Sequence, residues 1–132
     1  MVPFELRVLG FSVLLAFVHI VLAAHSASLQ RGYRWTASAR DEPVAPLSPA
    51  AGRLARALSN FCETFPLFAA LALAVVATGR VGSLSQWGAG LYIAGRILYL
   101  PLYAFGVPLV RSLAWNVSAV GILFLAYALL WS

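Results

Sequence analysis

Four polar residues interrupt a long apolar stretch at regular intervals: Arg53, Arg56, Asn60 and Glu63. At about 100° per residue, they fall within roughly 80° of one face of a helix. A charged side chain inside a membrane-spanning helix must face another protein group or a polar cavity, because lipid solvates it poorly. This stripe is therefore a candidate site for polar chemistry, and other segments must supply the groups that face it.

A second polar stripe lies further along the chain and contains Tyr92, Arg96, Tyr99 and Tyr103. On a helix these four side chains share a face roughly 60° wide. Tyrosines commonly anchor the ends of membrane helices, but Tyr92, Arg96 and Tyr99 are predicted to lie deeper than such anchors. With Arg111, at the start of the last apolar segment, they are expected to meet the first stripe at one depth.

The charges of the two stripes do not balance. Glu63 is the single carboxylate, whereas the cations are Arg53, Arg56, Arg96 and Arg111. A pair between Glu63 and Arg96, within a chain or between subunits, would join helices and is one complete interpretation. The other is a site that binds an anion, since surplus guanidiniums and phenols are typical of such sites.

Composition indicates an integral membrane protein. The chain has 132 residues, of which 62% are hydrophobic and 10% charged, whereas soluble domains are about 45–50% apolar. Its net charge of +5 is spread among apolar segments, which argues against nucleic-acid binding.

Cys62 is the only cysteine, so no intrachain disulfide or thiol metal cluster is expected. His19 and His25 fall about 120° apart on a helix and cannot share a metal.

The apolar segments predict an all-α fold, a single domain over residues 1–132 that forms an antiparallel four-helix bundle. The expected spans are residues 4–27, 53–78, 84–105 and 109–131. Each is close to the length of about 20 residues that crosses a bilayer. Residues 28–52 contain three prolines and are expected to form an extended loop at the membrane surface. In that loop, the run from Arg31 to Trp35 is either an interfacial anchor or a clamp over an anionic ligand.

Arginines are unevenly distributed between the two predicted sides of the membrane. Most lie in or beside the loops at 28–52 and 106–108, whereas the opposite side has only Arg7 and Arg80. The positive-inside rule predicts that both loops are cytoplasmic and that both termini are outside. All nine basic residues are arginine, a bias typical of GC-rich bacterial genomes, so a bacterial inner membrane is expected.

The first stripe and the residues after it read Arg53-x-x-Arg56-Ala57-x-x-Asn60-x-x-Glu63-x-Phe65-Pro66-x-Phe68. This run resembles the signature of the MAPEG family, the membrane-associated proteins in eicosanoid and glutathione metabolism. The run Arg96-x-x-Tyr99-x-x-x-Tyr103, followed by Arg111, is similar to the family's second block. The turn Gly106-Val107-Pro108 resembles the bacterial branch, and the resemblance covers the whole chain.

The resemblance implies a homotrimer that binds glutathione, as a co-substrate, between neighbouring subunits near the cytoplasmic side. It implies a transferase or peroxidase whose partners are the bilayer and a lipophilic electrophile. The glutathione-binding residues are then expected to be Arg34, Arg53, Arg56, Asn60, Glu63, Arg96, Tyr99 and Tyr103. Arg111 looks like the catalytic arginine, because a guanidinium beside a thiol lowers its pKa and the thiolate is the nucleophile.

Two positions depart from the leukotriene synthase branch of the family. Leu58 stands in place of a glutamine that helps to hold glutathione, and Thr64 stands in place of a tyrosine. These differences favour an alternative, a non-catalytic membrane protein of this fold that binds a lipid, another anion or a partner. A small transporter or channel subunit is a third hypothesis, but the last segment lacks a polar stripe from Val117 onward.

Overall fold

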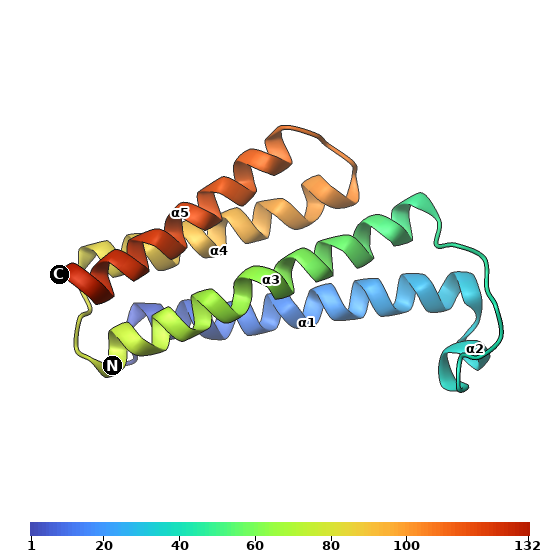
Figure 1. Cartoon of the computed structure of the whole chain (residues 1–132), viewed down its shortest axis with the longest axis horizontal. Coiled ribbons are helices and arrows are strands. Elements are labelled where there is room, and N and C mark those ends of the chain that lie inside the picture. Colours follow the sequence, from blue (N-terminus) through green and yellow to red (C-terminus); the bar gives the residue numbers. More distant parts are fainter.

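The computed structural model describes residues 1–132 as an all-α protein, which confirms the predicted class (Figure 1). Its helices are α1 (Phe4–Arg31), α2 (Tyr33–Ala37), α3 (Pro49–Ala77), α4 (Ser83–Ala104) and α5 (Val110–Trp131). The four long helices run antiparallel to one another in chain order, while α2 lies at the far end of α1 (Figure 1).

Helices α4 and α5 form the most closely packed pair, and glycines make this approach possible. A Cβ atom at Gly95 would lie 2.3 Å from Ser118 Oγ and 2.5 Å from the Ala114 carbonyl oxygen. Gly88 and Gly121 face each other, so that a Cβ on either would meet the other's carbonyl oxygen within 2.8 Å. Small residues let membrane helices pack backbone to backbone, so α4 and α5 form one closely packed pair.

The other pair is α1 with α3, and the two pairs are joined at the end where the chain begins. There the rings of Phe68 and Tyr92 stack at 4.0 Å, nearly parallel, and the buried Glu5 accepts a hydrogen bond from Ser85. Toward the turn between α4 and α5, the two pairs diverge (Figure 1). Polar groups at this open end are therefore less completely enclosed than those at the closed end.

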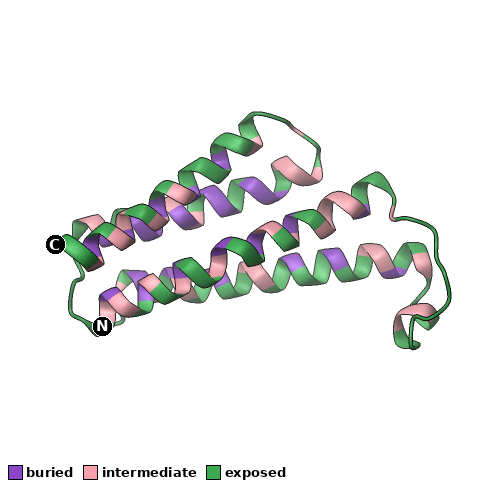
Figure 2. Ribbon diagram, viewed as in Figure 1, coloured by how far each residue is buried: buried purple, intermediate pink, exposed green.

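The outer surface of the bundle is apolar. Buried residues lie along the inner sides of the long helices (Figure 2), while Phe11, Phe17 and Leu123 are each more than 60% exposed. Such a surface is unfavourable in water but suits lipid. Helices α1, α3 and α5 are long and apolar enough to cross a membrane. Helices α4 and α5 have 22 residues each, but the serines, glycines and tyrosines of α4 make it less apolar than α5. The chain is an integral membrane protein.

Two helix boundaries and one loop differ from the sequence-based expectations. Helix α1 continues beyond residue 27 to Arg31 and ends where Gly32 adopts φ +93°. Helix α3 begins at Pro49 rather than at residue 53, because Ser48 Oγ caps the helix and accepts from the Ala51 amide. The intervening loop is not fully extended, since it includes α2.

Close packing of α4 on α5 gives a prediction with a matched control. Gly95→Ala places a methyl group against Ser118 and the Ala114 carbonyl, so we expect it to lower the free energy of unfolding by about 1–3 kcal/mol. Gly90→Ala meets no atom within 4 Å and is expected to be neutral or mildly stabilising. Thermal unfolding in detergent, followed by circular dichroism, measures both; equal destabilisation would contradict the packing argument.

Candidate functional site

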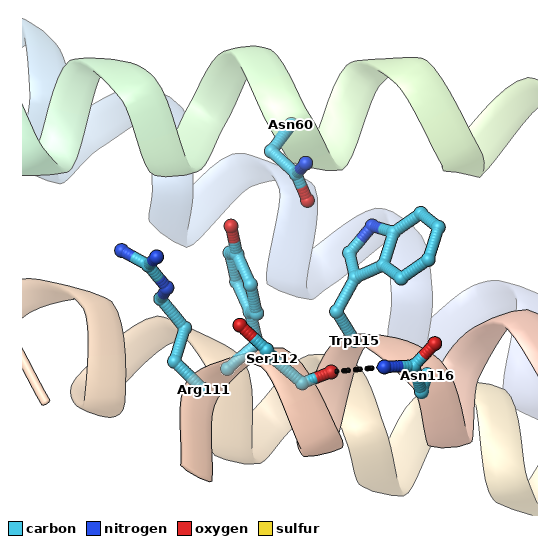
Figure 3. Close-up of a pocket in the computed structure, with 6 residues that line it drawn as sticks. Asn60, Arg111, Ser112, Trp115 and Asn116 are labelled. Carbon is cyan, nitrogen blue, oxygen red and sulfur yellow. Dashed lines mark hydrogen bonds between the residues drawn. The ribbon is translucent and has the colours of Figure 1, made fainter. Parts of the chain in front are cut away.

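A polar hollow of about 200 Å³ lies between α3 and α5 (Figure 3). Its lining residues are Asn60, Tyr99, Arg111, Ser112, Trp115 and Asn116. In Figure 3, Asn60 points from α3 toward α5, while Arg111 and Trp115 rise from α5 on either side of it. The lining contains one cation and no carboxylate, so the hollow favours an anionic ligand.

Three of these residues, Asn60, Tyr99 and Arg111, were predicted from the sequence, and the structure brings them together. Ser112, Trp115 and Asn116 were not proposed as site residues. Trp115 follows Arg111 by one helical turn and Asn116 follows Ser112 in the same way. That spacing was the available signal, because residues four apart share a helix face. Asn116 is held by its Nδ2, which donates to the Ser112 carbonyl oxygen at 2.9 Å (Figure 3).

Arg96 lies beneath the hollow rather than in its wall. It is fully buried, and its Nη1 donates to Asn60 Oδ1 at 2.9 Å. Its guanidinium also faces the ring of Tyr99 at 4.5 Å and that of Phe61 at 5.2 Å. Nε and Nη2 have no hydrogen-bond partner. Within one subunit, the hydrogen bond of Arg96 therefore goes to Asn60 and not to Glu63.

This contact determines which atom of the Asn60 amide is already bonded and which remains free. A guanidinium has donors only, so the atom that meets Arg96 must be the amide oxygen. The nitrogen, Nδ2, is left as a donor on the other side. Asn60 can therefore recognise an acceptor, such as a carboxylate or carbonyl oxygen of a ligand.

Tyr103 connects two further arginines at the open end. Its hydroxyl accepts from Arg56 Nε at 3.0 Å, and the Arg111 guanidinium lies 4.5 Å from its ring centre. The ring centres of Tyr99 and Tyr103 are 5.5 Å apart, and the two rings are tilted by 56°. Aromatic faces attract cations without neutralising them. The positive charge of Arg111 is thus held in position and remains available to a bound anion.

Arg53 has a contact that links helices. Its Nε donates to the carbonyl oxygen of Ala104 at 2.9 Å, which is the last residue of α4. Carbonyls at a helix C-terminus lack partners within the helix, and a cation there also suits the helix dipole. Arg53 thereby joins α3 to the turn between α4 and α5, where Gly106 adopts φ +70°.

Other predicted residues lie apart from the hollow in a single subunit. Glu63 and Arg56 are exposed on α3 and do not line it. Arg34 lies on α2, in a separate hollow with Arg31 and Arg40. Helix α2 packs against α1 alone, so Arg34 cannot reach Asn60 within the subunit.

The MAPEG family profile matches residues 8–131, nearly the whole chain. The chain belongs to the MAPEG family. A search of the curated proteins finds no match. Membership in the MAPEG family suggests a glutathione-related membrane enzyme, and the sequence resemblance to that family is confirmed.

The contact between Arg96 and Asn60 is testable by one substitution. Asn60→Asp sets a carboxylate against the buried guanidinium, which lacks a counter-charge in the subunit. We expect the variant to unfold at a higher temperature, since two opposite charges in a buried site attract more strongly than a charged donor and a neutral amide oxygen. Asn116→Asp, on the exposed side of the hollow, should give no such increase. A lower unfolding temperature for Asn60→Asp would contradict the assignment of Oδ1 to Arg96.

Proposed function

We propose that this MAPEG protein is a membrane-bound, glutathione-dependent transferase or peroxidase. It would activate the glutathione thiolate toward lipophilic electrophiles that arrive from the bilayer. The proposal rests on one observation: Arg111 lines a hollow without carboxylates, together with Asn60, whose amide oxygen is bonded to Arg96. Family membership supports the class of enzyme.

The chemical role proposed for Arg111 is electrostatic. A guanidinium remains protonated in proteins, so it neither donates nor accepts the thiol proton. Its charge stabilises the thiolate and lowers the pKa of the bound thiol. The thiolate then attacks the electrophile. Asn60 would orient the peptide through an acceptor oxygen, and Tyr99 and Tyr103 would form the wall beside it.

A complete site is proposed to need more than one subunit. The hollow of about 200 Å³ is smaller than the roughly 300–1,000 Å³ typical of small-molecule sites. Arg56 and Glu63 are exposed on a spanning helix, where charges require a protein or polar neighbour. A homotrimer would cover them. The proposed glutathione-binding residues are then Arg34, Arg53, Arg56, Asn60, Glu63, Tyr99 and Tyr103, with Arg96 acting through Asn60.

The alternative is a non-catalytic MAPEG protein that binds a lipid, another anion or a partner. Thr64 supports it, because this residue is buried and its hydroxyl lies 3.4 Å from Tyr92 Oη. It is therefore directed into the bundle and offers nothing to a ligand. Leu58 likewise has no polar group to offer.

We propose that the open end of the bundle faces the cytoplasm of a bacterial cell. The loop at 28–52 and the turn at 106–108 lie at this end (Figure 1). They are accompanied by most of the arginines, whereas Arg7 and Arg80 lie at the opposite end. The positive-inside rule supports this orientation, with both termini outside.

Glutathione binding tests the proposal directly. We expect calorimetry to give saturable binding to the detergent-purified protein, accompanied by thiolate absorbance. Arg111→Ala should retain binding and lose the thiolate signal, because it removes the stabilising charge. Arg56→Ala should weaken binding by at least about tenfold if its guanidinium pairs with a ligand carboxylate. Arg7→Ala, at the opposite end, is the control and should change neither.

The outcomes separate the two functions. Absence of binding to well-folded protein overturns the glutathione proposal. Binding without thiolate formation in the wild type supports the non-catalytic alternative.

The molar mass of the protein in detergent tests whether it forms a trimer. Light scattering in detergent, corrected for bound detergent, should give three chains of 14.1 kDa each. A monomer under conditions that preserve helical content would contradict the shared site, since Glu63 and the guanidinium donors of Arg56 that do not bond to Tyr103 would then face lipid.

A further inference from the structure

The segment after α1 is an ordered unit. Helix α2 is fixed to α1 by a hydrogen bond between His25 and Tyr33 at 2.8 Å and another between Ser28 and Thr36 at 2.9 Å. The Gln30 side chain then holds the returning chain, donating to the Pro46 carbonyl at 2.8 Å and accepting from the Ser48 amide at 2.7 Å. These contacts would be unnecessary in a simple tether between two spanning helices.

Within this unit, three arginines surround an indole. A hollow of about 600 Å³ is lined by Arg31, Arg34 and Arg40 around Trp35. The guanidinium of Arg31 lies 5.1 Å from the Trp35 ring centre, and that of Arg40 lies 5.7 Å from it. Like charges repel, so two guanidiniums on one ring require an attraction that offsets the repulsion.

The backbone holds Arg40 in an uncommon conformation that keeps it over the indole. Its φ angle is +64°, in the left-handed region that residues other than glycine rarely adopt. Its amide donates to Ser38 Oγ and its Nε to the Thr36 carbonyl, each at 3.1 Å. Trp35 is held in turn, because its Nε1 donates to the Glu42 carbonyl at 3.1 Å. Hydrogen bonds to the backbone and to Ser38 therefore hold both Arg40 and Trp35 in place.

Most donors of these arginines remain free. Arg31 Nη2 reaches the Ala45 carbonyl only at 3.5 Å, and the buried Arg31 Nε has no partner. Arg34 makes no side-chain hydrogen bond, and none of the three guanidiniums bonds to the carboxylates of Asp41 and Glu42 in the same hollow. Several guanidinium donors around one space match the oxygen atoms of a phosphate group.

The depth of the hollow indicates the source of that phosphate. Helix α1 has 28 residues and is therefore about 42 Å long, whereas the hydrocarbon core is about 30 Å thick. The excess of about 12 Å places at least one end of α1 among the lipid headgroups, and the arginines at the Arg31 end favour this end. Leu29 is 75% exposed just before it, which offers an apolar surface below the cations.

We propose that the Arg31–Arg34–Arg40 hollow binds the phosphate of an anionic phospholipid, whose acyl chains follow the apolar face of α1. This site is distinct from the hollow between α3 and α5, because α2 packs on α1 alone. It shares Arg34 with the glutathione site proposed for the trimer, whereas Arg31 and Arg40 are assigned to the lipid alone, so these two residues test it separately from the enzyme activity.

The test measures lipid binding to the detergent-purified full chain by native mass spectrometry. The probes are phosphatidylglycerol, zwitterionic phosphatidylcholine and inorganic phosphate. The double variant Arg31→Gln/Arg40→Gln removes two cations and leaves Arg34 for the proposed thiol site. We expect phosphatidylglycerol affinity to fall roughly fivefold for each arginine removed. Arg7→Gln, an exposed arginine at the opposite end of α1, is the matched control and should leave it unchanged.

Each result decides the proposal. Equal affinity of the double variant and the wild type for phosphatidylglycerol overturns it, as does equal affinity of the wild type for phosphatidylcholine. Displacement of the lipid by an equal concentration of inorganic phosphate overturns the lipid assignment in favour of a soluble anion. Circular dichroism and glutathione calorimetry on the same samples report folding and the other site separately. If the double variant loses helicity, the exposed Arg40→Gln replaces it, with a roughly fivefold loss expected.

Discussion

A permanently charged guanidinium at the centre of a membrane bundle constrains everything around it. Arg96 cannot lose its proton, so its burial must be offset by neighbours. The structure supplies the Asn60 oxygen and the ring faces of Phe61 and Tyr99. These contacts fix the rotation of α3 relative to α4. They also fix the direction of the Asn60 amide, so the same interaction that offsets the buried charge defines what the hollow can bind.

Helical periodicity explains how much of the site could be predicted. Residues with a common phase must share a face, so Asn60, Tyr99 and Arg111 could be expected to converge once four helices were inferred. Periodicity does not say which neighbour a side chain meets within that face. Arg96 was therefore grouped with the ligand-binding residues, although it lies beneath Asn60. Arg53 remains a proposed ligand-binding residue, but periodicity did not reveal that its Nε bonds to the end of α4.

The remaining differences arise from local backbone chemistry and from close packing. Prolines in residues 28–52 were read as helix breakers, but Pro49 occupies the first position of α3, where a missing amide proton is harmless. Trp115 and Ser112 reach the hollow because α5 lies so near α4, and that proximity depends on Gly95 and Gly121. The sequence contains these glycines, but their contact depends on the relative rotation of two helices.

Close packing of α4 on α5 also has a mechanical consequence. The two helices act as one arm, anchored near Ser85 by Glu5 and by the stack of Phe68 on Tyr92. From Ser85 to Tyr103 the arm is about 27 Å long. A rotation of about 4° at the anchored end therefore moves the far end by roughly 2 Å, with no helix unwound. Such a rotation widens or narrows the space between Arg111 and Asn60 while the anchored half of the bundle stays almost still. The hydrogen bonds of Arg53 to Ala104 and of Arg56 to Tyr103 join α3 to the far end of the arm, so they limit how far it moves.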